Sequence, residues 1–208
     1  NAFRAGQDIH AATAAAVQGV RLEDVTPEMR RHAKAVNFGL IYGMSAYGLT
    51  NATGLTLAEA ENFIETYFKE FPGVKKFLDR LRVTATERGY VETLLGRRRY
   101  FPNLESGAAY AVRQREEREA INAPIQGTAA DIIKLAMLKL PGEIEKVGLN
   151  AEMLLQVHDE LIFEVPENEL AQTAELVQKV MENTYQLDIP LSTDAKAGKS
   201  WGSMEKVE

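Results

Sequence analysis

Residues 153–165 read MLLQVHDELIFEV, with two apolar runs on either side of a short polar segment. Short apolar runs joined by a polar turn are typical of a β-hairpin. Only His158, Asp159 and Glu160 separate the runs, so we expect strands over residues 153–157 and 161–165. Rigid strands beside a turn can hold a side chain in a fixed place. The hairpin therefore bears on function as well as on the fold class.

The rest of the chain is predicted to be mainly helical. Thr26 can cap a helix with its side chain, and Pro27 suits the first helical position. Glu28 places a negative charge at the positive end of the helix dipole. They predict a helix over residues 27–42, and a capping box at Thr56 and Glu59 predicts another, which stops before Pro72. Further helices are expected over residues 7–18, from the break at Pro72 and Gly73 to about residue 88, and over residues 108–123, 125–140 and 167–185.

Two prolines are expected to limit the later helices, Pro124 by interrupting the chain of hydrogen bonds and Pro141 by ending it. A small hairpin over residues 90–101 and a last strand over residues 189–193 complete the prediction. Helices and antiparallel strands occupy separate stretches and do not alternate strictly, so the fold class predicted is α+β.

Composition excludes several classes of protein. The 208 residues are 45% hydrophobic and 26% charged, within the globular range, and contain no cysteine. Disulfides, thiolate zinc sites and cysteine nucleophiles are therefore excluded. No apolar run is long enough for a membrane-spanning helix, so no membrane partner is expected. The chain starts without methionine, and we expect it to come from a reducing compartment and to lack its true N-terminus.

Charge is unevenly distributed along the chain, although the net charge is −6. Up to residue 118 there are 17 Lys and Arg against 14 Asp and Glu, and after it 7 against 16. Basic clusters stand at residues 30–34, 97–99 and 113–118. Such clusters suit phosphate contacts in a cleft, but solvated helix faces would have the same composition, and charge alone leaves both interpretations open.

One predicted helix carries four functional candidates at a spacing of four: Arg30, Lys34, Phe38 and Tyr42. Each step of four drifts by about 40°, so the side chains form one slanted stripe. Cations could hold a triphosphate and the aromatic rings a sugar or base. The spacing alone favours a plainer alternative, a surface helix with packed aromatics and solvated cations.

The hairpin tip is the second candidate. Neighbouring residues of a strand point to opposite faces, so Asp159 and Glu160 are not both expected on one metal ion. We choose Asp159 as the primary ligand, with Mg²⁺ as the ion because hard oxygen donors suit it. Taken by itself, a solvated polar turn is the commoner explanation.

Longer strings carry a family resemblance. Residues 30–45, RRHAKAVNFGLIYGMS, closely resemble motif B, the nucleotide-binding fingers helix of family A DNA polymerases of the bacterial DNA polymerase I type. Residues 154–161, LLQVHDEL, resemble motif C, the catalytic palm hairpin of the same family. Residues 8–10 (DIH), 96–99 (GRRR) and 118–131 (REAINAPIQGTAAD) also match, so the resemblance covers nearly the whole chain.

The resemblance implies a bacterial, cytoplasmic enzyme of DNA-templated DNA synthesis. Residues 1–89 would form a mostly helical fingers lobe and residues 90–208 the C-terminal part of the palm, with a basic hairpin at 90–101 and the catalytic hairpin at 153–165. The reaction implied is nucleotidyl transfer from a dNTP to the 3′-hydroxyl of a primer–template DNA. The reaction would use two Mg²⁺ ions, or Mn²⁺ in their place.

Residue roles follow from the same resemblance. At the catalytic site, Asp159 would be the metal ligand and Glu160 an auxiliary carboxylate. Phe38 would pack on the incoming sugar and discriminate against dideoxynucleotides, and Tyr42 would occupy the insertion pocket until the fingers close. The triphosphate contacts would be His10, Arg30 and Lys34, and Lys34 would also act in catalysis by protonating the leaving pyrophosphate. The DNA contacts would be Arg118, Asn122, Gln126, His158 and Arg97. The motif leaves open which of residues 97–99 touches DNA.

One family feature has no match in residues 1–208, namely the motif A aspartate, which bridges both metal ions. We therefore expect an upstream polymerase segment with motif A and the thumb, in the same protein or a companion chain. The isolated chain is expected to be inactive. The alternative is a non-catalytic nucleotide- or DNA-binding fragment of the same fold.

Overall fold

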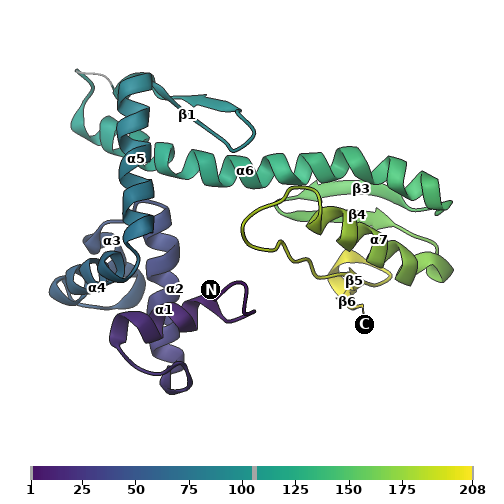
Figure 1. Ribbon diagram of the computed structural model, residues 1–208, viewed down its shortest axis with the longest axis horizontal. Coiled ribbons are helices and arrows are strands. Elements are labelled where there is room, and N and C mark those ends of the chain that lie inside the picture. Colours follow the sequence, from purple (N-terminus) through teal and green to yellow (C-terminus); the bar gives the residue numbers. More distant parts are fainter. Residues whose placement is uncertain (1, 105–106, 208) are drawn as a thin grey trace. The chain divides into compact units, whose positions relative to one another are not determined.

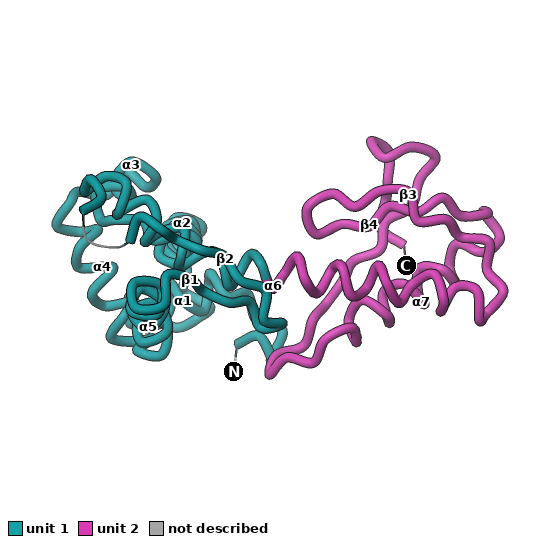
Figure 2. The backbone as a smooth tube through the Cα atoms, turned by 90° about the horizontal axis from the view of Figure 1, so that it is seen from above, with its two compact units in different colours: residues 1–127 teal, residues 128–208 magenta. Residues whose placement is uncertain are grey.

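A computed structural model describes residues 2–104 and 107–207 (Figure 1). The chain divides into two compact units, Asn1–Gly127 and Thr128–Glu208, which meet within the long helix α6 (Figure 2). Helices dominate and the strands form antiparallel pairs, so the predicted α+β class is confirmed. The units divide at a different place from the fingers–palm boundary expected at residues 89 and 90, because the first unit also includes a hairpin and the first part of α6.

Side-chain caps mark where helices α1 to α4 begin. Asp8 accepts hydrogen bonds from two backbone N–H groups of α1, and Thr26 and Thr56 form capping boxes for α2 and α4. The short helix α3, capped by Ser45, was not predicted. The helices and 3₁₀ turns of this unit are α1 (Ile9–Gln18), η1 (Leu22–Asp24), α2 (Pro27–Ile41), α3 (Ala46–Thr53), α4 (Leu57–Glu70), α5 (Pro72–Arg88) and η2 (Pro102–Leu104).

The core of helices α1 to α4 is built on small residues. Ala14, Ala33 and Ala60 are fully buried, one each from α1, α2 and α4. Their short side chains let the helix backbones approach, and the larger Phe63 and Tyr67 fill the remaining space. This packing determines which residues of α1 can reach α2.

A hairpin packs beside this core. Strands β1 (Tyr90–Glu92) and β2 (Arg98–Tyr100) pair antiparallel, as predicted. Val91 is buried in a second cluster with Phe101, Leu81 of α5 and Ala120 of α6. The hairpin is thus fixed to α6 by apolar burial.

The two prolines do not limit α6 (Tyr110–Val147), which runs for 38 residues through Pro124 and Pro141. The prediction of two helices, 108–123 and 125–140, was wrong. A proline inside a helix removes one hydrogen bond and costs about 3 kcal/mol. Here both halves of α6 are anchored in hydrophobic clusters, through Ala120 and through Leu140, and Pro124 is itself buried. Burial outweighs the local preference of proline.

The second unit packs a hairpin on α6 and α7. Its elements are β3 (Glu152–Val157), β4 (Glu160–Glu164), η3 (Glu167–Glu169), α7 (Leu170–Glu182), β5 (Lys196–Ala197), η4 (Trp201–Ser203) and β6 (Glu205–Lys206). Leu161 and Phe163 of β4 contact a cluster that includes Leu140 of α6 and Val177 of α7. The hairpin prediction is confirmed, but the turn has two residues, because Glu160 already pairs with Val157.

The strand predicted over residues 189–193 does not form. Its backbone bonds to α7: Thr193 donates its N–H to Glu182, and its carbonyl accepts from Gln178. The last strand pair is instead β5 with β6. The helix predicted to residue 185 ends at Glu182.

Membrane-spanning helices are not found in the part of the chain that the structure describes, since none is both long and apolar enough to cross a bilayer.

We predict that Leu140→Ala lowers the free energy of unfolding by about 2–5 kcal/mol, because a fully buried side chain leaves a cavity. Leu138→Ala on the same helix is the matched control, since Leu138 is 78% exposed. Urea unfolding of both variants measures the difference. Equal losses of stability in the two variants would contradict the burial of Leu140 in the core of the second unit.

Candidate functional site

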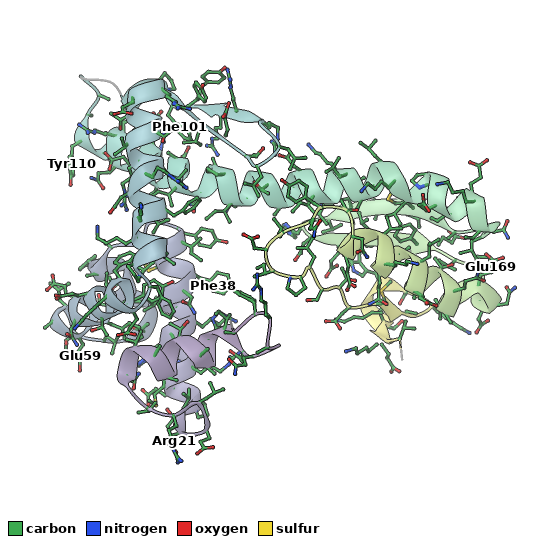
Figure 3. The ribbon with its side chains drawn as sticks, viewed as in Figure 1. Arg21, Phe38, Glu59, Phe101, Tyr110 and Glu169 are labelled. Carbon is green, nitrogen blue, oxygen red and sulfur yellow. The ribbon has the colours of Figure 1, made fainter. Side chains whose placement is uncertain are left out.

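The four predicted stripe residues lie on α2 and on its C-cap residue, Tyr42. The rings of Phe38 and Tyr42 stack with centroids 6.2 Å apart, and both side chains remain open to solvent, at 46% and 40% exposed. Figure 3 labels Phe38. The Nζ atom of Lys34 lies 6.0 Å from the centroid of the Phe38 ring. Ala33, Val36 and Leu40 of the same helix are buried in the core. The buried face therefore leaves a cationic and aromatic stripe on the outside.

Two glycines near this stripe, Gly39 and Gly43, lie in close contact with other residues of the chain. A Cβ on Gly39 would come within 2.9 Å of the Met44 sulfur. Gly43 has a φ of 69°, and a Cβ there would lie 2.9 Å from Cγ of Arg118. Only glycine meets both requirements at position 43 without strain. The glycines thus allow the end of α2 to pack closely on Met44 and α6.

Asp8 links the cap of α1 to the stripe. Its Oδ1 accepts from the backbone N–H groups of His10 and Ala11, and its Oδ2 accepts from Nε and an Nη of Arg30, at 2.9 and 2.7 Å. The hydrogen bond from Arg30, followed by that from Ala11, lowers the pKa of Asp8 from 3.8 to about 2. Asp8 thereby holds the Arg30 guanidinium in place. The site prediction missed this role, although a capping position could have indicated the residue.

His10 extends the same face from α1. Its ring centroid lies 5.6 Å from that of Phe38, and its Nδ1 lies 3.1 Å from the side-chain nitrogen of Asn37. Burial is the main cause that lowers the pKa of His10, and Arg30 and Lys34 lower it further while Asp8 opposes them. The structure thus brings together the five residues expected to bind nucleotide, namely His10, Arg30, Lys34, Phe38 and Tyr42.

The predicted DNA-contact residues of α6 lie on one continuous helix. Arg118 packs against Gly43, and Gln126 is exposed. The side-chain oxygen of Asn122 is buried and, among the described residues, has no hydrogen-bond partner. Each of these side chains carries N–H donors.

The three arginines of the basic hairpin contact other residues of the chain, in α6 and in the hairpin itself. Arg97 donates to the Gly127 carbonyl at 2.9 Å. Arg98 pairs with Glu92 at 2.7 Å and Arg99 with Glu119 at 2.5 Å. The three arginines thus support the packing of the hairpin, and their distances do not single out one as a DNA contact.

The tip of the β3–β4 hairpin consists of His158 and Asp159. His158 has a φ of 53°, which is unusual for a residue other than glycine, and Gln156 donates to its carbonyl at 2.6 Å. Asp159 and Glu160 are both exposed. Asp159 of the turn and Glu160 at the start of β4 thus present two neighbouring carboxylates to solvent.

These two carboxylates do not make up a metal site by themselves. Within residues 2–104 and 107–207, no group of three or more His, Asp or Glu side chains is placed to hold an ion. Asp159 and Glu160 are hard oxygen donors of the kind that Mg²⁺ prefers. Their chemistry fits magnesium, but their number does not complete its coordination.

Asp8→Asn is predicted to destabilise the fold above pH 4, because the charged partner of Arg30 is lost. The folded-state pKa lies below the unfolded value, so the stabilising effect is complete above about pH 4 and disappears as the pH falls towards 2. Urea unfolding between pH 2.5 and 7 should show the two stability curves converging at low pH. A constant difference across this range would contradict the ion pair, and Asp24→Asn, which alters an exposed pair with Arg21, serves as the control.

Comparison with known proteins supports one family. The family model described as DNA polymerase family A matches residues 1–203. The chain is 49% identical to DNA polymerase I of Pseudomonas aeruginosa over 201 residues, and 50% identical to thermostable DNA polymerase I of Thermus filiformis over 199 residues. These alignments cover 97% and 96% of this chain but only 22% and 24% of the relatives. The chain thus spans less than a quarter of their length.

A solved structure agrees with this result. The polymerase domain of Pol1 from M. smegmatis, in complex with a DNA primer–template and dNTP, has a TM-score of 0.86 and 47% identity to this chain. The match covers 92% of this chain and 34% of that structure. Sequence, family model and fold agree, and the chain belongs to DNA polymerase family A.

Proposed function

We propose that the α1–α2 face binds a deoxynucleoside triphosphate for DNA-templated DNA synthesis. The observation that carries the proposal is that cations and exposed aromatic rings meet on this face, with Lys34 beside Phe38 and Phe38 stacked on Tyr42. Cations suit phosphate oxygens, and an exposed ring suits a sugar or base. The related Pol1 domain is described in complex with primer–template and dNTP, which supports the same ligands here.

Each side chain of this face has a proposed task. Arg30, held by Asp8, and Lys34 bind the triphosphate, and Lys34 protonates the leaving pyrophosphate. His10 adds a third phosphate contact. Phe38 packs against the sugar and discriminates against dideoxynucleotides, and Tyr42 fills the insertion pocket while no nucleotide is bound. A helix that closes over its ligand would act as a lid.

The carboxylates of the hairpin turn have the second task. We propose that Asp159 is a metal ligand and that Glu160 assists it. Two Mg²⁺ ions, or Mn²⁺ in their place, would activate the primer 3′-hydroxyl and neutralise charge on the phosphates. The two carboxylates need a further ligand such as the motif A aspartate. We place it on an upstream segment with the thumb, so that the isolated chain does not extend a primer.

The α6 side chains are proposed to follow the DNA minor groove. Every base pair presents acceptors there, and Arg118, Asn122 and Gln126 carry donors that can bind them without reading sequence. His158 would reach the primer end. Arg97 has five N–H donors, so it can bind the Gly127 carbonyl and a DNA phosphate at the same time.

The residue division proposed is a fingers subdomain at residues 1–89 and the C-terminal part of the palm at residues 90–208, in a bacterial cytoplasmic enzyme of replication and repair. A second candidate is a non-catalytic nucleotide- or DNA-binding fragment. The small donor set at Asp159 favours it, since no group of three ligands is present among the described residues.

Lys34→Ala is predicted to weaken binding of dATP in Mg²⁺ about 10- to 100-fold, because a charge-assisted hydrogen bond to phosphate is lost. Isothermal titration of the full chain measures this. Lys76→Ala, at an exposed position of α5, removes the same charge and should leave binding unchanged. Equal affinity of the Lys34 variant and the parent chain would refute the assignment of the stripe.

Primer extension separates the two candidate functions. The chain alone should give no product, and a mixture with a polypeptide that supplies the motif A segment and thumb should give activity. In that mixture Asp159→Asn should reduce the rate about a thousandfold or more, since a metal ligand stabilises transition-state charge by several kcal/mol. Asp194→Asn, in an exposed pair with Lys206, is the control. Full activity of the Asp159 variant would leave the binding fragment as the better description.

A further inference from the structure

A polar cluster, which joins α1 to α2, lies behind the nucleotide-binding face. Thr13 and Asn37 are 1% and 9% exposed. The Thr13 hydroxyl donates to the Ile9 carbonyl at 2.8 Å, the Asn37 side-chain nitrogen lies 3.0 Å from that hydroxyl, and the same nitrogen lies 3.1 Å from Nδ1 of His10. Buried polar groups of this kind are expected to satisfy each other.

Counting hydrogens determines the direction of these bonds. The Thr13 hydroxyl has one hydrogen to donate. The Ile9 carbonyl lies closer to it than the Asn37 side-chain oxygen does, at 2.8 Å against 3.3 Å, so the hydroxyl donates to Ile9. The Asn37 nitrogen must then donate to Thr13, and its second hydrogen points to Nδ1 of His10. Nδ1 is therefore an acceptor and carries no proton.

We propose that Asn37 is a positioning residue that keeps the His10 ring neutral, with its hydrogen on Nε2. A neutral imidazole has one donor nitrogen and one acceptor nitrogen. Because Nδ1 is occupied by Asn37, Nε2–H is the group that His10 can offer to a ligand. The functional part of this inference rests on the proposed nucleotide site: His10 gives a phosphate oxygen a neutral hydrogen bond, and Arg30 and Lys34 supply the positive charge.

The surroundings of His10 favour a neutral ring. Burial lowers its pKa, and the positive charges of Arg30 and Lys34 on α2 lower it further. Asp8, before α1, opposes them, but its Oδ2 is engaged by Arg30. Two acids of η1, Glu23 and Asp24, pair with Arg21. Glu59 of α4 lies with Gln18 at the far end of α1.

Nitrogen NMR of the full chain, labelled with ¹⁵N-histidine, tests the ring state without any ligand. At pH 7 the His10 ring should show a protonated Nε2 and an unprotonated Nδ1, with a pKa below 6.5. A protonated Nδ1 at this pH would overturn the proposal, whatever the behaviour of any variant. His10→Gln assigns the signals among the three histidines.

Asn37→Asp supplies the matched perturbation. A carboxylate in place of the amide accepts a hydrogen from Nδ1, so the pKa of His10 should rise by about one to three units. Asn51→Asp, at an exposed position of α3, adds the same charge elsewhere and should leave this pKa unchanged. An unchanged His10 pKa in a folded Asn37→Asp variant would exclude a positioning role.

Binding of dATP in Mg²⁺, measured from pH 6 to 8, then tests the functional part. The ratio of the affinities of Asn37→Asp and the parent chain should change with pH as His10 of the variant titrates, and Asn51→Asp should show a constant ratio. A constant ratio for Asn37→Asp would refute the contact between His10 and phosphate. Absence of dATP binding to the parent chain would instead refute the proposed function, and the NMR result would still decide the ring state.

Discussion

Close packing of α1 on α2 is the constraint on which the first unit depends. Ala14 and Ala33 are fully buried between the helices, and no larger side chains could occupy these positions without moving the backbones apart. Hydrogen bonds weaken steeply as the distance between donor and acceptor grows. A small increase in the distance between α1 and α2 would therefore break the Asp8–Arg30 and Asn37–His10 contacts. Two alanines thus determine whether the proposed nucleotide-binding face can form.

Features encoded by neighbouring residues were predictable from the sequence. Caps at Thr26 and Thr56, the hairpin around Asp159 and the spacing of the stripe residues depend on contacts within a few positions of the chain. The structure confirmed the elements, and it brought His10 to the stripe as the resemblance implied. The chemical roles of these residues remain proposals.

Features that depend on distant contacts were not predictable. A proline inside a helix usually kinks or ends it. The burial of both halves of α6 in separate clusters explains why Pro124 does not end this helix. The apolar segment from Ile189 resembles a strand, but Glu182 and Gln178 of α7 take its polar groups at Thr193. Asn37 was overlooked because a polar residue within a helix gives no sign that it faces a histidine 27 positions away.

The continuity of α6 also has a consequence for cooperativity. Extending a helix costs far less free energy than nucleating one, so the half of α6 that is ordered in one hydrophobic cluster acts as a template for the other half. Folding of the two units is then thermodynamically linked through a shared backbone. Pro124, which withholds one hydrogen bond from the helix, is the place where that linkage is weakest and where partial unfolding would first separate one unit from the other.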